Sequence, residues 1–112
     1  MSKTDELGDV GTTLLFENDK VRIWELSLAP GERGALHEHH YDNVLVQIEG
    51  DRVAVEPSPD TRSVYDQYFE ADIGRGNSLF VTKGGIERAV NVGQKPYYEI
   101  IVELKEAPSS SS

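Results

Sequence analysis

The chain has 112 residues, the length of one domain, and a domain of this size buries roughly two-thirds of the surface that its unfolded chain exposes. It carries 20 acidic and 11 basic residues, a formal charge of −9, and the basic residues are scattered singly. Such a surface repels phosphate backbones and anionic lipids, so we expect neither nucleic acid nor a membrane as partner. The absence of cysteine excludes disulfides, thiolate nucleophiles and thiolate metal sites.

The two ends of the chain are polar. The opening MSKTDELGDVGTT lacks the apolar run of a signal peptide, and no stretch approaches a membrane span, so we expect a cytoplasmic protein. Residues 1–13 are expected to form a flexible arm, and EAPSSSS, residues 106–112, a disordered tail. This leaves residues 14–105 for the folded domain.

Between the two ends, short runs of alternating apolar and polar residues are separated by Gly and Pro turns. In VRIWELSL, residues 21–28, the side chains of Trp24, Leu26 and Leu28 fall on one face of a strand. In the last run, apolar residues at the even positions from Tyr98 to Leu104 alternate with polar neighbours. No helix longer than a turn is predicted, so the pattern indicates an all-β sandwich or barrel. Further strands are predicted at residues 14–16, 43–49, 52–56, 64–71, 78–81, 86–92 and 97–104.

All three histidines lie in one stretch, GERGALHEHHYDNVLVQIEG, and His37 and His39 are separated by one residue. In an extended strand, side chains at i and i+2 point to the same face, so two imidazoles can meet at one point. Imidazole binds zinc, copper, iron and nickel. The pair therefore predicts a transition-metal site without identifying the metal, and solvated surface histidines are the alternative interpretation.

The spacing around the histidines resembles the first sequence motif of the cupin superfamily. It runs Gly31, five residues, His37, one residue, His39, three residues, Asn43, six residues, Gly50. Where the family usually places a glutamate ligand, this chain has Asn43. The departure leaves open whether this position binds metal.

A second stretch, GNSLFVTKGGIERAVN, resembles the second cupin motif at Gly84 and Asn91. The family's last ligand histidine corresponds to Glu87 and its usual proline to Thr82. The resemblance covers about residues 21–104 and implies a double-stranded β-helix, the cupin jelly-roll barrel. It implies the fold more than the function, because cupins host many unrelated chemistries on one barrel.

The strand at residues 43–49 has one apolar and one mainly polar face. If His37 and His39 face the interior, the cupin spacing places Asn43, Leu45 and Gln47 of the polar face there too. The opposite register, with an apolar core, remains the alternative. The motif spacing favours the first register, which leaves the other face uncovered and so predicts a homodimer. That uncovered face consists of Val44, Val46 and Ile48.

The metal ligands that the resemblance implies are His37, His39 and Glu87, with Asn43 as a weak fourth ligand or a hydrogen-bond partner. Two histidines and one carboxylate form the facial triad of non-haem Fe(II) oxygenases, and a similar set holds catalytic zinc. We expect a divalent transition metal, with Fe(II) favoured and Zn, Mn or Ni as alternatives. Glu87 and Gln47 are the candidate catalytic residues.

Four side chains are candidates for contacts with the substrate. Tyr41 and Gln47 could orient a polar substrate, and Trp24 and Phe80 could form the apolar wall of its pocket. Each of the four also fits a role in packing or on the surface.

Three functions fit this set of residues. The resemblance to cupin oxygenases implies a non-haem Fe(II) dioxygenase acting on a small organic acid or ketone. A metal-assisted lyase or isomerase, in which the metal only polarises a carbonyl or carboxylate, is the second. The third is a metal-free module that binds a small ligand, because two of the four expected ligand positions are changed. All three have a small molecule as partner.

Overall fold

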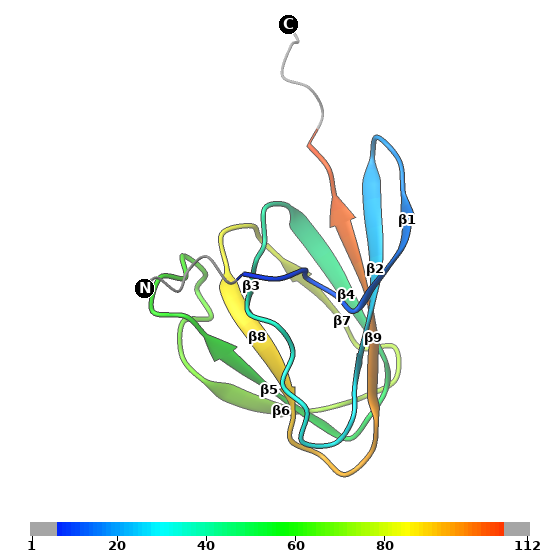
Figure 1. Ribbon diagram of the computed structural model, residues 1–112, viewed down its shortest axis with the longest axis vertical. Coiled ribbons are helices and arrows are strands. Elements are labelled where there is room, and N and C mark those ends of the chain that lie inside the picture. Colours follow the sequence, from blue (N-terminus) through cyan, green and yellow to red (C-terminus); the bar gives the residue numbers. More distant parts are fainter. Residues whose placement is uncertain (1–6, 107–112) are drawn as a thin grey trace, which may run out of the picture.

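The computed structural model describes residues 7–106, which form nine strands and no helix. The strands make two antiparallel sheets, ordered β1-β2-β9-β4-β7 and β3-β8-β5-β6, which face each other around a common interior (Figure 1). Within this part of the chain there is accordingly no helix that could cross a membrane. The predicted all-β barrel is confirmed. The strands are β1 (Thr13–Glu17), β2 (Val21–Leu28), β3 (His37–Glu38), β4 (Asp42–Glu49), β5 (Arg52–Pro57), β6 (Phe69–Asp72), β7 (Ser78–Val81), β8 (Ile86–Asn91) and β9 (Tyr97–Leu104).

Most strands lie where the alternating pattern predicts them, and β2, β7 and β9 have the predicted bounds. The strand predicted at residues 64–71 is wrong in its first half. Only Phe69 to Asp72 pair with β5, whereas Val64 is 83% exposed and Tyr65 is exposed in a loop. Local alternation favoured a strand here, but a strand also needs a neighbour for its backbone hydrogen bonds, and within residues 7–106 this stretch has none.

The segment from Leu7 to Thr13 lies against the barrel, which corrects the described part of the predicted flexible arm. The backbone N–H of Gly8 donates to the carbonyl of Leu36, and that of Thr12 donates to the carbonyl of Glu25. Val10 is 6% exposed and belongs to the hydrophobic core. A single apolar residue among polar ones has no periodicity, so its burial leaves no signal in the sequence. Residues 1–6 and 107–112 lie outside the described part of the chain.

The core lies between the sheets, with its centre on β2 and β9. As predicted, Trp24, Leu26 and Leu28 are buried on one face of β2. They pack with further buried residues and with three partly buried ones, Leu45, Ile73 and Ala89. The further buried residues are Val10, Val53, Tyr97 and Ile101.

On β4 the polar face points to the interior, as the motif spacing predicted. Asn43 is 0% exposed and Gln47 is 7% exposed, while Val44 and Val46 lie on the outer face and are half-buried. The same holds on β9, where the even-numbered apolar residues face outward. The odd-numbered residues Tyr97, Glu99, Ile101 and Glu103 are the buried ones.

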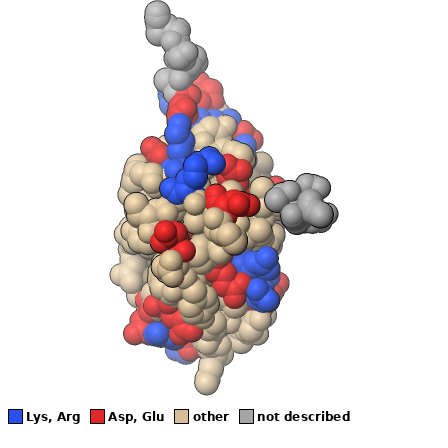
Figure 2. Space-filling model, turned by 90° about the vertical axis from the view of Figure 1, so that its left-hand side faces the viewer, with Lys and Arg blue, Asp and Glu red and all other residues tan. Residues whose placement is uncertain are grey.

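The outer faces of the two sheets differ in character. One apolar row crosses all five strands of the larger sheet through direct cross-strand pairs: Phe16, Ile23, Val102, Val44 and Phe80. The smaller sheet carries ion pairs instead, such as Arg52 with Glu70 and Arg88 with Glu56. Figure 2 shows acidic and basic side chains beside one another on the side of the molecule that lies at the left in Figure 1.

Candidate metal centre

Two short strands bring the predicted metal ligands together. In the antiparallel pair of β3 and β8, His37 is the direct partner of Glu87. His39 follows two residues after His37 and, as the i, i+2 spacing predicted, points to the same side. Both histidines are buried, at 7% and 3% exposure, and the Glu87 side chain is 16% exposed.

The distances between the ligand atoms fit a small metal ion. The Nε2 atoms of His37 and His39 are 3.2 Å apart, and Nε2 of His39 is 3.3 Å from Oε2 of Glu87. The three donor atoms all lie within 4.8 Å of one another. A metal with bonds of about 2.1 Å holds neighbouring ligand atoms about 3.0–3.4 Å apart. The donor set and these two spacings therefore fit a first-row divalent metal.

The turn between β7 and β8 fixes the backbone of His39. Its N–H donates to the carbonyl of Gly85 at 2.8 Å, and its carbonyl accepts from the N–H of Gly84 at 2.9 Å. Gly84 has φ of +110°, a conformation that residues with a Cβ rarely adopt. The glycine of the second motif therefore has a direct structural role beside the histidine.

Asn43 lies behind His39 and not among the three donor atoms. Its Nδ2 is 3.2 Å from Nδ1 of His39, on the side of the ring away from Glu87. Of the two roles left open for Asn43, the geometry supports that of hydrogen-bond partner, and its role as a weak fourth ligand stays a prediction. Its Oδ1 is buried without a hydrogen-bond partner within residues 7–106. Nδ2 also donates to the carbonyls of Tyr41 and Val81, at 3.3 and 3.5 Å. Turning the amide by 180° would exchange these two bonds for one in which Oδ1 accepts from Nδ1–H of His39, which leaves Nε2 free to bind a metal.

The protonation of the cluster follows from burial and from the mutual proximity of its groups. Burial, together with the neighbouring His39, lowers the pKa of His37 to about 4. For Glu87, burial acts to raise the pKa, but the hydrogen bond and the charge of His39 outweigh it, so the pKa lies below its ordinary value. At neutral pH the cluster therefore holds a neutral His37 and an ionised Glu87, the forms that bind metals.

The triad lines a cavity of about 90 Å³ inside the barrel. The cavity wall is mostly apolar, and Gln47 contributes a polar group, as predicted. Oε1 of Gln47 accepts a long hydrogen bond, 3.4 Å, from the N–H of Gly74. The apolar wall includes Leu26, Leu45, Val53, Val55, Leu79 and Ile101.

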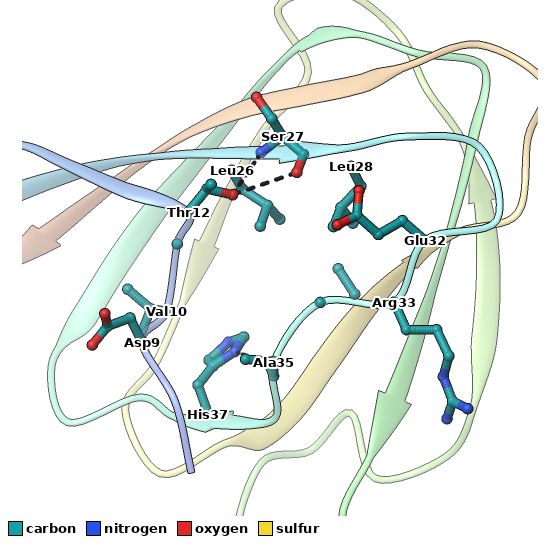
Figure 3. Close-up of a pocket in the computed structure, with 13 residues that line it drawn as sticks. Asp9, Val10, Thr12, Leu26, Ser27, Leu28, Glu32, Arg33, Ala35 and His37 are labelled. Carbon is teal, nitrogen blue, oxygen red and sulfur yellow. Dashed lines mark hydrogen bonds between the residues drawn. The ribbon is translucent and has the colours of Figure 1, made fainter. Parts of the chain in front are cut away.

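A second cavity, of about 190 Å³, also adjoins His37 (Figure 3). It opens between β2 and the loop that leads into β3, and residues 9–12 border it. Residues 9–12 are bound to β2 at Thr12, because Oγ1 of Thr12 accepts a hydrogen bond from the N–H of Ser27 at 3.0 Å. Val10, Leu26, His37 and Ala89 line both cavities, so the two cavities adjoin each other at these residues.

Trp24 and Tyr41 do not line the interior cavity, which corrects their prediction as substrate contacts. The guanidinium of Arg22 lies 5.5 Å from the ring centre of Trp24 and 5.8 Å from that of Tyr41. Trp24 is buried, and its indole N–H donates to Oε1 of Glu103 at 2.8 Å. Nε of Arg22 is 3.1 Å from the same oxygen but is not aligned for a hydrogen bond. The two aromatic rings thus surround an ion pair.

Phe80 is also placed differently from the prediction. It lies on the outer face of β7 opposite Val44 and is 58% exposed, whereas its neighbour Leu79 lines the cavity. The alternation along a strand allows only one of two successive residues to face inward. Leu79 therefore replaces Phe80 as the apolar wall.

Among the hydrogen-bonding residues of the cavity, sequence reasoning missed Glu99 and Tyr97 on β9. Both are buried, at 6% and 2% exposure, and the Tyr97 hydroxyl donates a hydrogen bond to Oε1 of Glu99. The available signal was the pairing of β9 with β4, in which Glu99 is the direct partner of Gln47. Once the polar face of β4 is inside, the polar residues of a neighbouring strand in register must be inside as well.

Comparisons with known proteins identify the fold. Neither a scan against protein-family models nor a search of curated protein sequences finds a match. A cupin domain from Bordetella pertussis has 20% sequence identity and a TM-score of 0.71, over 84% of this chain and 91% of that one. A cupin with a double-stranded β-helix fold from Methanocaldococcus jannaschii has 14% identity and a TM-score of 0.63, over 88% and 94%.

A third solved structure has a stated function. It is a polyketide cyclase from Streptomyces resistomycificus, with 19% identity and a TM-score of 0.57 over 81% of this chain and 58% of that one. Identities this low establish a common fold and leave the activity of this chain to its own residues.

Proposed function

We propose that this chain, which has the double-stranded β-helix fold of the cupins, is a metal-dependent enzyme acting on a small organic acid or ketone. The observation that carries the proposal is the convergence of His37, His39 and Glu87 on the lining of an interior cavity. Two histidines and one carboxylate leave coordination positions open for substrate and O2. This favours Fe(II), which when bound would supply the redox chemistry of a dioxygenase.

The residues around the triad have separate roles in this proposal. His37, His39 and Glu87 hold the metal, and Asn43 orients the ring of His39 through Nδ1. Gln47, on the cavity wall, hydrogen-bonds the polar group of the substrate. The apolar wall excludes water from the bound substrate, which strengthens every electrostatic contact inside the cavity.

A metal-assisted lyase or isomerase is the second candidate. The polyketide cyclase among the structures of similar fold supports it, because it shows that this barrel hosts an activity named for ring closure. In that case the metal acts as a Lewis acid on a carbonyl oxygen. The changed residues at positions 43 and 87 support the third candidate, a metal-free binding module.

The test begins with elemental analysis of the protein purified without a histidine tag. Anaerobic reconstitution with Fe(II) follows, with oxygen-electrode measurements over small carboxylates, diketones and phenols. Oxygen uptake coupled to substrate loss is the expected result. Turnover that continues undiminished without oxygen, or with zinc in place of iron, would replace the dioxygenase by the lyase or isomerase. If the protein binds no first-row metal, the metal-free binding module remains as the candidate function.

A further inference from the structure

Glu99 is a buried carboxyl group inside the barrel that the proposed metal site does not use. It lies on β9, 6% exposed, between Leu26 of β2 and Gln47 of β4 in the cross-strand register. It lines the same cavity as the triad. Among residues 7–106, its side chain has one hydrogen-bond partner, the hydroxyl of Tyr97, which donates to Oε1. Oε2 is therefore left to interact with a ligand in the cavity.

The charges that face this cavity are predominantly negative. Glu87 faces the cavity from β8, and Glu99 faces it from β9. His37 faces it from β3, and His39 faces it from the position just after β3. The one arginine of the lining, Arg88, alternates with Glu87 along β8, so its side chain belongs to the outer face. Its Nε lies 3.8 Å from Glu56 there. In the metal-free cavity, a carboxylate ligand would therefore meet two carboxylates, while the side chain of Arg88 lies toward Glu56.

We propose that Glu99 is a ligand-binding group of the metal-free interior cavity that selects small neutral molecules with an N–H donor, such as amides, over carboxylates. We take the interior cavity as the ligand site, as in the proposed function. A divalent metal at the triad would itself attract a carboxylate, so the selection is defined for the metal-free cavity.

The physical basis is the cost of placing like charges close together where water is excluded. Burial raises the pKa of Glu99 to about 7, and the nearby Glu87 also acts to raise it. The hydrogen bond from the Tyr97 hydroxyl and the charge of His39 act to lower this pKa, but their effects are smaller. Above that pH, Glu99 is an anion that accepts a hydrogen bond from an amide and repels a carboxylate. Tyr97 remains a donor throughout, because its own pKa is raised far above the ordinary value by burial and by Glu99.

The test uses two probes of the same shape and different charge, isobutyramide and isobutyrate. Their dissociation constants are measured at about pH 8, above the pKa of Glu99, by chemical-shift titration of EDTA-treated protein, so that neither probe can bind a metal. Glu99→Gln removes the charge and keeps the shape of the side chain. Glu103→Gln is the matched control, because Glu103 is an equally buried carboxyl on the same face of β9 but does not line the cavity. Circular dichroism confirms folding, and Glu99→Met serves as a second neutral variant if Glu99→Gln does not fold.

We expect the wild type and Glu103→Gln to bind the amide at least roughly tenfold more tightly than the carboxylate, and Glu99→Gln to lose this preference. Equal affinity of the two probes for the wild type, an unchanged preference in Glu99→Gln, or no binding of either probe would overturn the proposal. Metal titration of the same proteins keeps the two proposals apart. A wild type that binds no metal but retains the amide preference refutes the metal-dependent function alone, whereas loss of metal binding in Glu99→Gln would make Glu99 a ligand and overturn this assignment.

Discussion

His37 and Glu87 are direct partners across the antiparallel pair of β3 and β8. The chain between them contains four strands, so their proximity is a product of the barrel and not of local sequence. β3 has only two residues, and the turn at Gly84 and Gly85 supplies further hydrogen bonds to His39 just beyond it. The candidate metal centre is thus built where a very short strand is held by its neighbours.

The histidine pair should be required for metal binding. His37→Ala and His39→Ala each remove one of the three donors, so each should abolish the near one equivalent of first-row metal that we expect in the wild type. Elemental analysis after dialysis measures the content. His40→Ala is the matched control, because His40 is exposed and is not part of the triad. Full metal retention by the double variant His37→Ala/His39→Ala would exclude the site.

Glu87 should contribute more to metal affinity than Asn43. Asn43→Ala removes a hydrogen-bond partner of His39 and should cost roughly 10-fold to 100-fold in affinity. Glu87→Ala removes an anionic ligand atom and should cost more than that, and Glu87→Gln separates the loss of charge from the loss of volume. Competition titration with a chelating dye measures each dissociation constant. A larger loss in Asn43→Ala than in Glu87→Ala would show that the amide, and not the carboxylate, holds the metal.

The stability of the metal-free protein should depend on pH in the way that the raised pKa of Glu99 predicts. Its pKa is about 7 in the folded chain against an ordinary value of 4.5, so the folded state binds this proton more tightly. The contribution of Glu99 to stability is therefore fully present below the unfolded pKa and is lost as the pH rises through the folded one. The free energy of unfolding of the wild type relative to Glu99→Gln should fall by about 3 kcal/mol between about pH 4.5 and pH 8.

Urea unfolding followed by Trp24 fluorescence measures this difference. His37 acts in the opposite sense, because its lowered pKa makes the folded state gain stability as the pH rises from about 4 to 6.5. Both proteins contain His37, so its contribution cancels in the comparison. Parallel pH profiles for the two proteins would contradict the raised pKa of Glu99.

A homodimer remains a prediction, now with a defined surface on the outer face of the five-stranded sheet. The apolar row that includes Phe16, Val44 and Phe80 crosses this sheet, while the outer face of the other sheet carries ion pairs. In a chain of net charge −9, an apolar face is where two copies repel each other least. Phe80→Glu should therefore give a monomer in light scattering, whereas Val64→Glu, at an exposed loop position, should not. A monomeric wild type at micromolar concentration would refute the dimer.

The sequence by itself determined the strands and the pairing of two ligands. A strand's period and its turn residues are local properties, so β2, β7 and β9 could be predicted to the residue. The i, i+2 spacing of His37 and His39 likewise needs only an extended backbone to place both rings on one side. The cupin-like spacing added Glu87, which no local geometry connects to the histidines.

The tertiary structure decided which face of β7 and of β9 is inside. On β9 the hydrophobic pattern favours Ile100 and Val102 as core residues, yet Glu99 and Glu103 are buried in their place. Burying a carboxylate is costly unless it finds a partner, and the partners here, Tyr97 for Glu99 and Trp24 for Glu103, are supplied by the folded barrel. In the same way, Leu79 faces the cavity instead of Phe80 because β7 pairs with β4 in a register set by the whole sheet. Alternation predicts that a strand has two faces, and only its neighbours determine which of them points to the interior.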